Sequence, residues 1–175
     1  MENILKLIFL LNSVSGPIAM LIIAVSTRKR IDILSISDYV RVGKDPLILL
    51  EVVLMSANVI QGMFCLYLYL NHGFPVTILL GTLAGIIGVV VSFTRIDFHF
   101  KVHISLTIVA LLCYSLSVFL TSILLGNRVL FITSLIQVLT IPIGYPLKLK
   151  TKHLEVVYFT LLGIWNILVF AIFFK

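Results

Sequence analysis

Charged side chains are scarce in this chain. Only 7 acidic and 13 basic residues occur among 175, so that 11% of positions are charged, whereas a soluble domain carries about 25%. Hydrophobic residues make up 61% and the mean hydropathy is +1.20. A water-soluble fold of this length could not hide that much apolar surface. The composition therefore excludes a soluble domain and predicts a polytopic integral membrane protein with one transmembrane domain, residues 1–175.

Cysteine is almost absent as well. Cys65 and Cys113 both fall inside apolar runs, where small buried hydrophobic residues are a better interpretation than a disulfide or a metal pair. The net charge of +6 does not indicate nucleic acid, because the basic residues lie in short loops between apolar runs. No secretory cleavage site is evident near the start, so we expect the first apolar run to be a retained helix.

The apolar runs are long enough to cross a bilayer. A span needs about 20 residues, and backbone amides in lipid must be satisfied within the span. The runs lack the alternation of a barrel, so we predict an all-α fold, a bundle of six transmembrane helices. The predicted spans are residues 4–25, 47–70, 76–93, 104–125, 129–147 and 154–174.

Helix-ending signals separate these spans. Asp45 and Pro46 match an N-cap and a first helical position, and "LNHGFP" (residues 70–75) is typical of a tight turn. Gly126 and Asn127 match a C-cap followed by an N-cap, and Pro146 should end the fifth helix. We therefore expect an up-down bundle in which only the first loop is long.

The basic residues are divided unequally between the two sides of this bundle. The termini and the even loops hold Lys6, Arg128 and Lys175, whereas the first, third and fifth loops hold the other 10 of the 13 Lys and Arg. The positive-inside rule places the more basic side in the cytoplasm. Both termini are therefore predicted to be non-cytoplasmic.

A few polar groups fall inside the spans. At 100° per residue, Glu51, Asn58 and Gly62 share one face of the second span. One interpretation of this face is a proton or cation site. In the other, Glu51 lies near the membrane surface and its side chain reaches the basic loop, while Asn58 forms a hydrogen bond between helices. Pro17 in "NSVSGP" predicts a kink. "GTLAGIIG" predicts a close helix contact, within the chain or between chains.

The first, third and fifth loops should bring their polar residues to one membrane surface. The candidate ligand face consists of Ser37, Asp38, Asp97, His99, His103, His153 and Glu155.

Three interpretations of this face remain open. His99 and His103, at i and i+4, could bind zinc with Asp97 and support a metal-dependent membrane hydrolase, although the Glu of an H-E-x-x-H motif is missing. His103 and His153, at the starts of two spans, could hold haem in a subunit of a larger redox or transport complex. The simplest interpretation is a polar interfacial corner, in which Asp97 caps the fourth helix and the basic residues attract anionic lipid headgroups.

Parts of the sequence resemble a known family. "ILSISDYVRVGKDPLILLEVVLMSANVIQG" resembles the S-x-x-x-S-D-x-G stretch, followed by P-x-x-x-x-F-N, of a prokaryotic six-span family known as domain of unknown function 998. "GIIGVVVSFTRIDFHFKVHISLTIVALL" is similar to its third-to-fourth span junction, and "KTKHLEVVYFTLLGIW" to the polar entry of the last span. The layout also resembles the DRAM/Frag/Sfk membrane proteins. The resemblance implies six spans and makes Ser37, Asp38, Asp97 and His103 the signature residues; it implies no particular chemistry or cofactor.

From the sequence we expect a non-catalytic multi-pass membrane protein. Its polar, basic face would bind lipid headgroups, anionic ones above all, or a partner membrane subunit. The metal-dependent hydrolase and the complex subunit are the alternatives.

Overall fold

The computed structural model describes residues 2–26, 48–93, 96–144, 146–147 and 151–174, and every long element in these ranges is helical. The elements are α1 (Glu2–Ser26), α3 (Ile48–His72), the 3-10 helix η1 (Val76–Ile78), α4 (Leu79–Phe93), α5 (Ile96–Leu124), α6 (Arg128–Gly144) and α7 (Thr151–Phe173). No strand occurs among the described residues. The predicted all-α class is confirmed.

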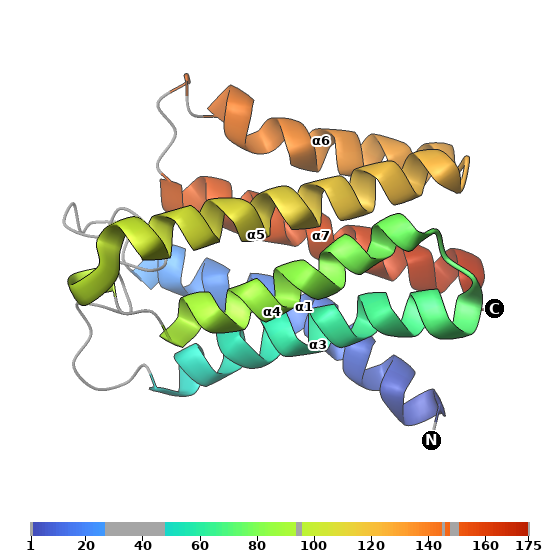
Figure 1. The fold of residues 1–175 in the computed structure, drawn as a ribbon, viewed down its shortest axis with the longest axis horizontal. Helices are drawn as coiled ribbons and strands as arrows, with labels where there is room; N and C mark the ends of the chain where they lie inside the picture. The colour runs from blue at the N-terminus through green and yellow to red at the C-terminus, as the bar shows by residue number, and fades with distance from the viewer. Residues whose placement is uncertain (1, 27–47, 94–95, 145, 148–150, 175) are drawn as a thin grey trace.

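The helices run alternately up and down along one long axis (Figure 1). The end of α1, the start of α3, the α4–α5 junction, the end of α6 and the start of α7 lie together at one end of the bundle. We call this end the basic end, after the ten Lys and Arg that the sequence places in or near the first, third and fifth connections. The two chain termini, the α3–η1 turn and the α5–α6 turn lie at the other end, which we call the terminal end.

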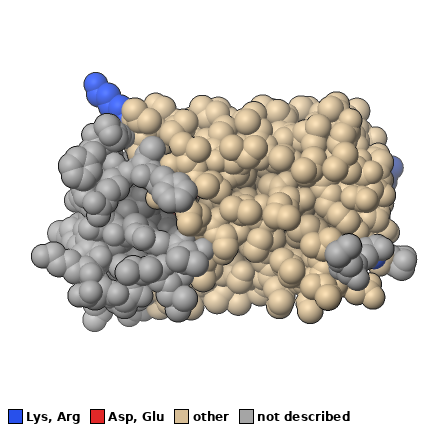
Figure 2. Space-filling view, turned by 60° about the horizontal axis from the view of Figure 1, so that its bottom comes forward, with Lys and Arg blue, Asp and Glu red and all other residues tan. Residues whose placement is uncertain are grey.

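Three of these helices are long and apolar enough to cross a membrane. The qualifying segments within the described residues are Asn3–Ile22, Lys101–Leu124 and His153–Phe173, and two shorter apolar helices cover Val76–Ser92 and Arg128–Thr140. The surface agrees with a lipid environment, because large apolar side chains are exposed along every α-helix; examples are Leu7, Met63, Ile86, Leu112, Ile136 and Ile164. Figure 2 shows a broad uncharged surface between the two ends, with Lys and Arg side chains only toward them.

The interior is also largely apolar, with a core that includes Phe64, Leu68 and Trp165. It differs from the surface between the two ends in the polar side chains that it holds, which are those of Asn12, Ser13, Gln61, His103, Ser117, Thr121, Ser122, Ser134, Gln137 and Asn166. Lipid tails are as apolar as leucine, so transmembrane helices associate through close packing and hydrogen bonds more than through hydrophobic burial. Inward-facing polar groups of this kind are therefore suited to joining helices.

Two turns form as their residues predict. Gly126 has φ +63°, which only glycine adopts without strain, and its amide donates to the Ile123 carbonyl at 3.0 Å. The Asn127 side-chain oxygen accepts hydrogen bonds from the amides of Val129 and Leu130 at 3.0 and 3.1 Å, which confirms it as the N-cap of α6. Gly73, φ +63°, makes the corresponding turn after α3.

The helix that contains the predicted fourth span begins before that span. The predicted span starts at residue 104, and one interpretation made Asp97 the cap of its helix, but α5 already begins at Ile96. Asp97 and His99 are therefore inside the helix. The segment from Ile96 to Leu124 contains no Gly or Pro. The helical hydrogen bonds of the backbone can therefore continue without interruption from the polar start of α5 into its apolar part.

The close contact predicted for "GTLAGIIG" lies between α3 and α4. A Cβ on Gly85 would come within 2.7 Å of the Asn58 carbonyl oxygen and 2.8 Å of the Gly62 Cα, and one on Gly88 within 2.5 Å of the Asn58 Oδ1. Thr82 also donates a hydrogen bond from its hydroxyl to the Gly62 carbonyl at 3.2 Å. The glycines thus bring the two backbones together within one chain.

Candidate functional site

The predicted ligand face is described only in part. Ser37 and Asp38 lie outside the described residues, and the same is true of the side chains of Glu51, Asp97 and His99. His103 is buried near the start of α5, where its carbonyl accepts a hydrogen bond from the Thr107 hydroxyl at 2.8 Å. At the start of α7, His153 is exposed and Glu155 is half-buried.

The helix arrangement determines which of these positions share an end of the molecule. The starts of α5 and α7 both lie at the basic end (Figure 1), so positions 97, 99, 103, 153 and 155 belong to that end. In the part of the chain that the structure describes, no three His, Cys, Asp or Glu side chains could together hold a metal ion. Two of the three residues in the zinc hypothesis have side chains outside that part, so the hypothesis stays a prediction.

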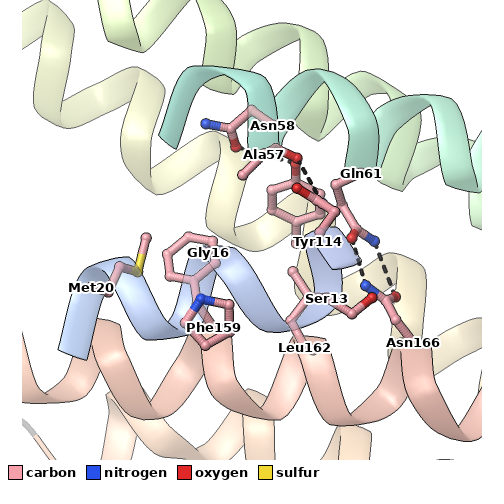
Figure 3. A pocket seen from close by; sticks show the side chains of 13 residues that line it. Ser13, Gly16, Met20, Ala57, Asn58, Gln61, Tyr114, Phe159, Leu162 and Asn166 are labelled. Atoms are coloured by element: carbon pink, nitrogen blue, oxygen red, sulfur yellow. Dashed lines mark hydrogen bonds between the residues drawn. The ribbon is translucent and has the colours of Figure 1, made fainter. Parts of the chain in front are cut away.

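The structure also contains a feature that sequence reasoning missed, a partly open cavity between the helices, whose largely apolar wall includes several polar side chains. It has a volume of about 70 Å³ and lies between α1, α3, α5 and α7 (Figure 3). Its polar lining consists of Asn12, Ser13, Asn58, Gln61, Tyr114 and Asn166. Only Asn58 among these was predicted as a site residue.

Hydrogen bonds across the helices hold this lining in place. Gln61 of α3 and Asn166 of α7 bond each other twice, from Gln61 Nε2 to Asn166 Oδ1 at 3.2 Å and from Asn166 Nδ2 to Gln61 Oε1 at 2.6 Å. The Asn12 amide of α1 donates to the Ala57 carbonyl of α3 at 3.2 Å. The Tyr114 hydroxyl of α5 donates to Asn58 Oδ1 at 3.4 Å. Four helices therefore contribute fixed polar groups to one cavity.

The wall of the cavity at α1 and α7 depends on a proline and a glycine. Pro17 has no amide hydrogen, so the Ser13 carbonyl loses its partner within α1. A Cβ on Gly163 of α7 would overlap this carbonyl oxygen, and it would lie 3.3 Å from Pro17 Cγ. Glycine at position 163 thus lets α7 cover the carbonyl that the proline exposes, and α1 continues as one helix through Ser26.

The chemistry of the lining is neutral. The cavity has no Asp, Glu, His, Lys, Arg or Cys among its lining residues, and Ser13 donates its hydroxyl proton to the Phe9 carbonyl at 2.9 Å. No pair of groups here can act as nucleophile and base. The cavity can therefore donate and accept hydrogen bonds, but its residues do not suit acid–base or covalent catalysis.

Other buried polar groups outside the cavity have structural roles. The Trp165 indole donates to the Ser122 hydroxyl at 2.9 Å, which joins α7 to α5, and the Tyr158 hydroxyl donates to the Leu111 carbonyl at 2.8 Å. Gln137 of α6 differs, because it is fully buried and its side-chain amide makes no hydrogen bond of good geometry, although the Tyr158 side chain lies beside it.

The signal that could have revealed the cavity is weak but present in the sequence. Asn12, Asn58, Gln61 and Asn166 are amides near the middle of otherwise apolar runs. Their number predicts helix-to-helix hydrogen bonds; their convergence on one point depends on how the helices pack. Comparison with protein families, curated proteins and solved structures gives no match to this chain.

Proposed function

We propose that this chain is a non-catalytic, six-span integral membrane protein that binds anionic lipid headgroups at its basic end. The three long apolar helices account for three of the spans. α3 adds 25 residues, about 37 Å at 1.5 Å per residue, and η1 with α4 and then α6 supply the remaining two.

The observation that carries the proposal is the gathering of helix ends. Three connections of the chain join helix ends at the basic end (Figure 1), and the sequence places eight of the thirteen Lys and Arg in these connections, with Lys101 and Lys152 near the starts of α5 and α7. A cluster of basic residues at a membrane surface attracts anionic lipid by about 1 kcal/mol per Lys or Arg. The same asymmetry places the basic end in the cytoplasm and both termini outside.

The test compares two triple variants of equal charge change. K148Q/K150Q/K152Q removes three charges that the sequence places just before and at the start of α7, at the basic end, whereas K6Q/R128Q/K175Q removes the three that it places at the terminal end. Purified proteins in zwitterionic micelles are titrated with phosphatidylglycerol, and the rise in Tm is measured for each.

The basic-end variant should lose a large part of the lipid-induced rise, and the terminal-end variant should keep it. Because the readout is a difference between lipid conditions, the loss of the Lys6 contact with the Phe174 ring, at 5.1 Å, cancels. Salt should weaken the rise in the wild-type protein. Equal responses from both variants would refute the proposal, and so would a rise of the same size with phosphatidylcholine.

A further inference from the structure

The cavity between α1, α3, α5 and α7 has no part in lipid binding at the basic end and needs its own explanation. Cavities that stay empty in proteins are apolar, and polar ones hold water or a ligand. This one has six polar side chains in its wall and a volume of about 70 Å³. A water molecule takes about 30 Å³ in the liquid, so the space suits a group of two or three non-hydrogen atoms.

The occupant should carry no charge. A charged group within a bilayer costs at least about 2.5–3.5 kcal/mol unless it is paired, and none of the lining residues offers a counter-charge. This also separates the cavity from the proton or cation site considered for Glu51, which is seven positions before Asn58 on α3.

The occupant should both donate and accept hydrogen bonds. A side-chain amide has two N–H donors and a carbonyl acceptor that accepts two bonds, so the lining amides present both donors and acceptors beside the bonds from Asn12 to the Ala57 carbonyl and between Gln61 and Asn166. Tyr114 adds a hydroxyl. A hydroxyl group is the smallest uncharged group that matches such a mixed wall, because one oxygen both donates and accepts.

The cavity has a more polar side and a more apolar side. Figure 3 places Met20 and Phe159 on the side away from the Gln61–Asn166 pair, and both line the cavity together with Leu162. A carbon next to a hydroxyl would therefore meet apolar atoms, while its oxygen meets the amides.

We propose that this cavity binds an uncharged hydroxyl group, supplied either by water or by the alcohol end of a membrane amphiphile. The proposal is independent of the lipid headgroup site, since it concerns residues of the bundle interior and a ligand without charge.

The experiment uses the full chain in nanodiscs and three photoactivatable probes of equal length. The first is a long-chain alcohol with a diazirine next to the hydroxyl end, the second has a methyl group in place of the hydroxyl, and the third has a carboxylate. If the hydroxyl comes from an amphiphile, the alcohol should label peptides containing Ser13–Met20 or Phe159–Asn166 about two- to tenfold more than the methyl probe, the range that one hydrogen bond gives.

Two variants and a matched control locate the effect. Ala57→Leu fills part of the cavity and should abolish the preference for the alcohol, and Tyr114→Phe should reduce it because only a hydroxyl is lost. Tyr69→Phe makes the same change on an exposed side chain of α3 that does not line the cavity and should leave the preference unchanged. Trp165 fluorescence, from the single Trp of the chain, shows whether each variant is folded.

The second experiment determines the structure of the protein in nanodiscs at a resolution at which ordered water is visible. Ordered water bonded to the lining amides, together with equal labelling by the alcohol and methyl probes, assigns the hydroxyl to water and supports the proposal. A dry cavity would overturn it, as would preferential labelling by the carboxylate probe. An alcohol preference that survives unchanged in both folded Ala57→Leu and Tyr114→Phe would overturn the assignment to this cavity.

Discussion

The side-chain amides of Gln61 and Asn166 form two reciprocal hydrogen bonds, although 105 positions separate them in the chain. Gln61 is 6% exposed and Asn166 2%, so neither amide is accessible to bulk solvent. The pair joins α3 to α7 beside the cavity and fixes the depth at which the two helices meet.

Gln61→Leu should destabilise the protein by about 1–2 kcal/mol, because the Asn166 amide is then buried without this partner. Asn166→Leu should have a similar effect. The double variant should lose less than the sum of the two single variants, since both buried amides are then gone. Unfolding in mixed micelles, followed by Trp165 fluorescence, measures the three values; strict additivity would mean that the pair contributes nothing as a pair.

Gln137→Leu should raise the free energy of unfolding, in contrast to Gln61→Leu and Asn166→Leu. Its amide is fully buried and makes no hydrogen bond of good geometry, although the Tyr158 side chain lies beside it, so replacing it with an apolar side chain of similar size removes a desolvation cost of about 1–3 kcal/mol. The free energy of unfolding should rise by about 1 kcal/mol. A loss of stability as large as that of Gln61→Leu would show that Gln137 has a partner in the membrane, water included.

Gly85→Ala and Gly16→Ala make a matched pair of small substitutions in helices. At Gly85 the new methyl would meet backbone atoms of Asn58 and Gly62, at 2.7 and 2.8 Å, and backbone cannot move aside, so we expect a loss of about 1–3 kcal/mol. At Gly16 the nearest atom is the Ala57 Cβ at 3.7 Å, an ordinary contact. Gly16→Ala should therefore be neutral or raise stability by about 0.5–1 kcal/mol. Thermal unfolding distinguishes them, and equal effects would contradict the α3–α4 packing.

Ser122→Ala should destabilise the chain and alter its fluorescence. The Trp165 indole N–H loses its acceptor at 2.9 Å in a fully buried site, which should cost about 1–2 kcal/mol and shift the emission maximum. Ser134→Ala is the control, because Ser134 is equally buried but its hydroxyl donates only to the Phe131 carbonyl of its own helix. If both variants give the same spectrum, the indole does not depend on Ser122.

The proposed six-span orientation predicts a pattern of chemical labelling. Cysteines introduced for Asn71 and Arg128, both exposed at the terminal end, should react with a membrane-impermeant maleimide on intact cells. Cysteines introduced for Pro146 and His153, exposed at the basic end, should react only after lysis. The unsubstituted chain, with buried Cys65 and half-buried Cys113, gives the background. Reaction of Asn71→Cys and Arg128→Cys from different sides would refute an even number of crossings between them.

The sequence by itself determined the class of the fold and most helix ends. Scarce charge and long apolar runs leave no solvent but lipid for so much apolar surface, and a backbone in lipid must be helical when no strand alternation is present. Local chemistry then fixes the turns: Gly126 and Asn127 end one helix and begin the next with bonds made inside a few residues. The predicted span from residue 104 follows the fall in polarity and does not give the start of α5 at Ile96, because a helix ends only where its backbone hydrogen bonds are interrupted.

Tertiary structure alone decided which polar groups meet. Asn12, Gln61 and Asn166 each lie in a different helix, and helical periodicity gives the face of each residue but neither the neighbour nor the depth of contact. The partner of Gln61 follows from how α1, α3 and α7 pack, with Gly163 allowing the close contact between α7 and α1. The physical reason is the separation of the interacting residues along the chain. Caps and turns form between near neighbours, whereas the cavity forms from contacts between residues as far apart as Gln61 and Asn166, which are 105 positions apart.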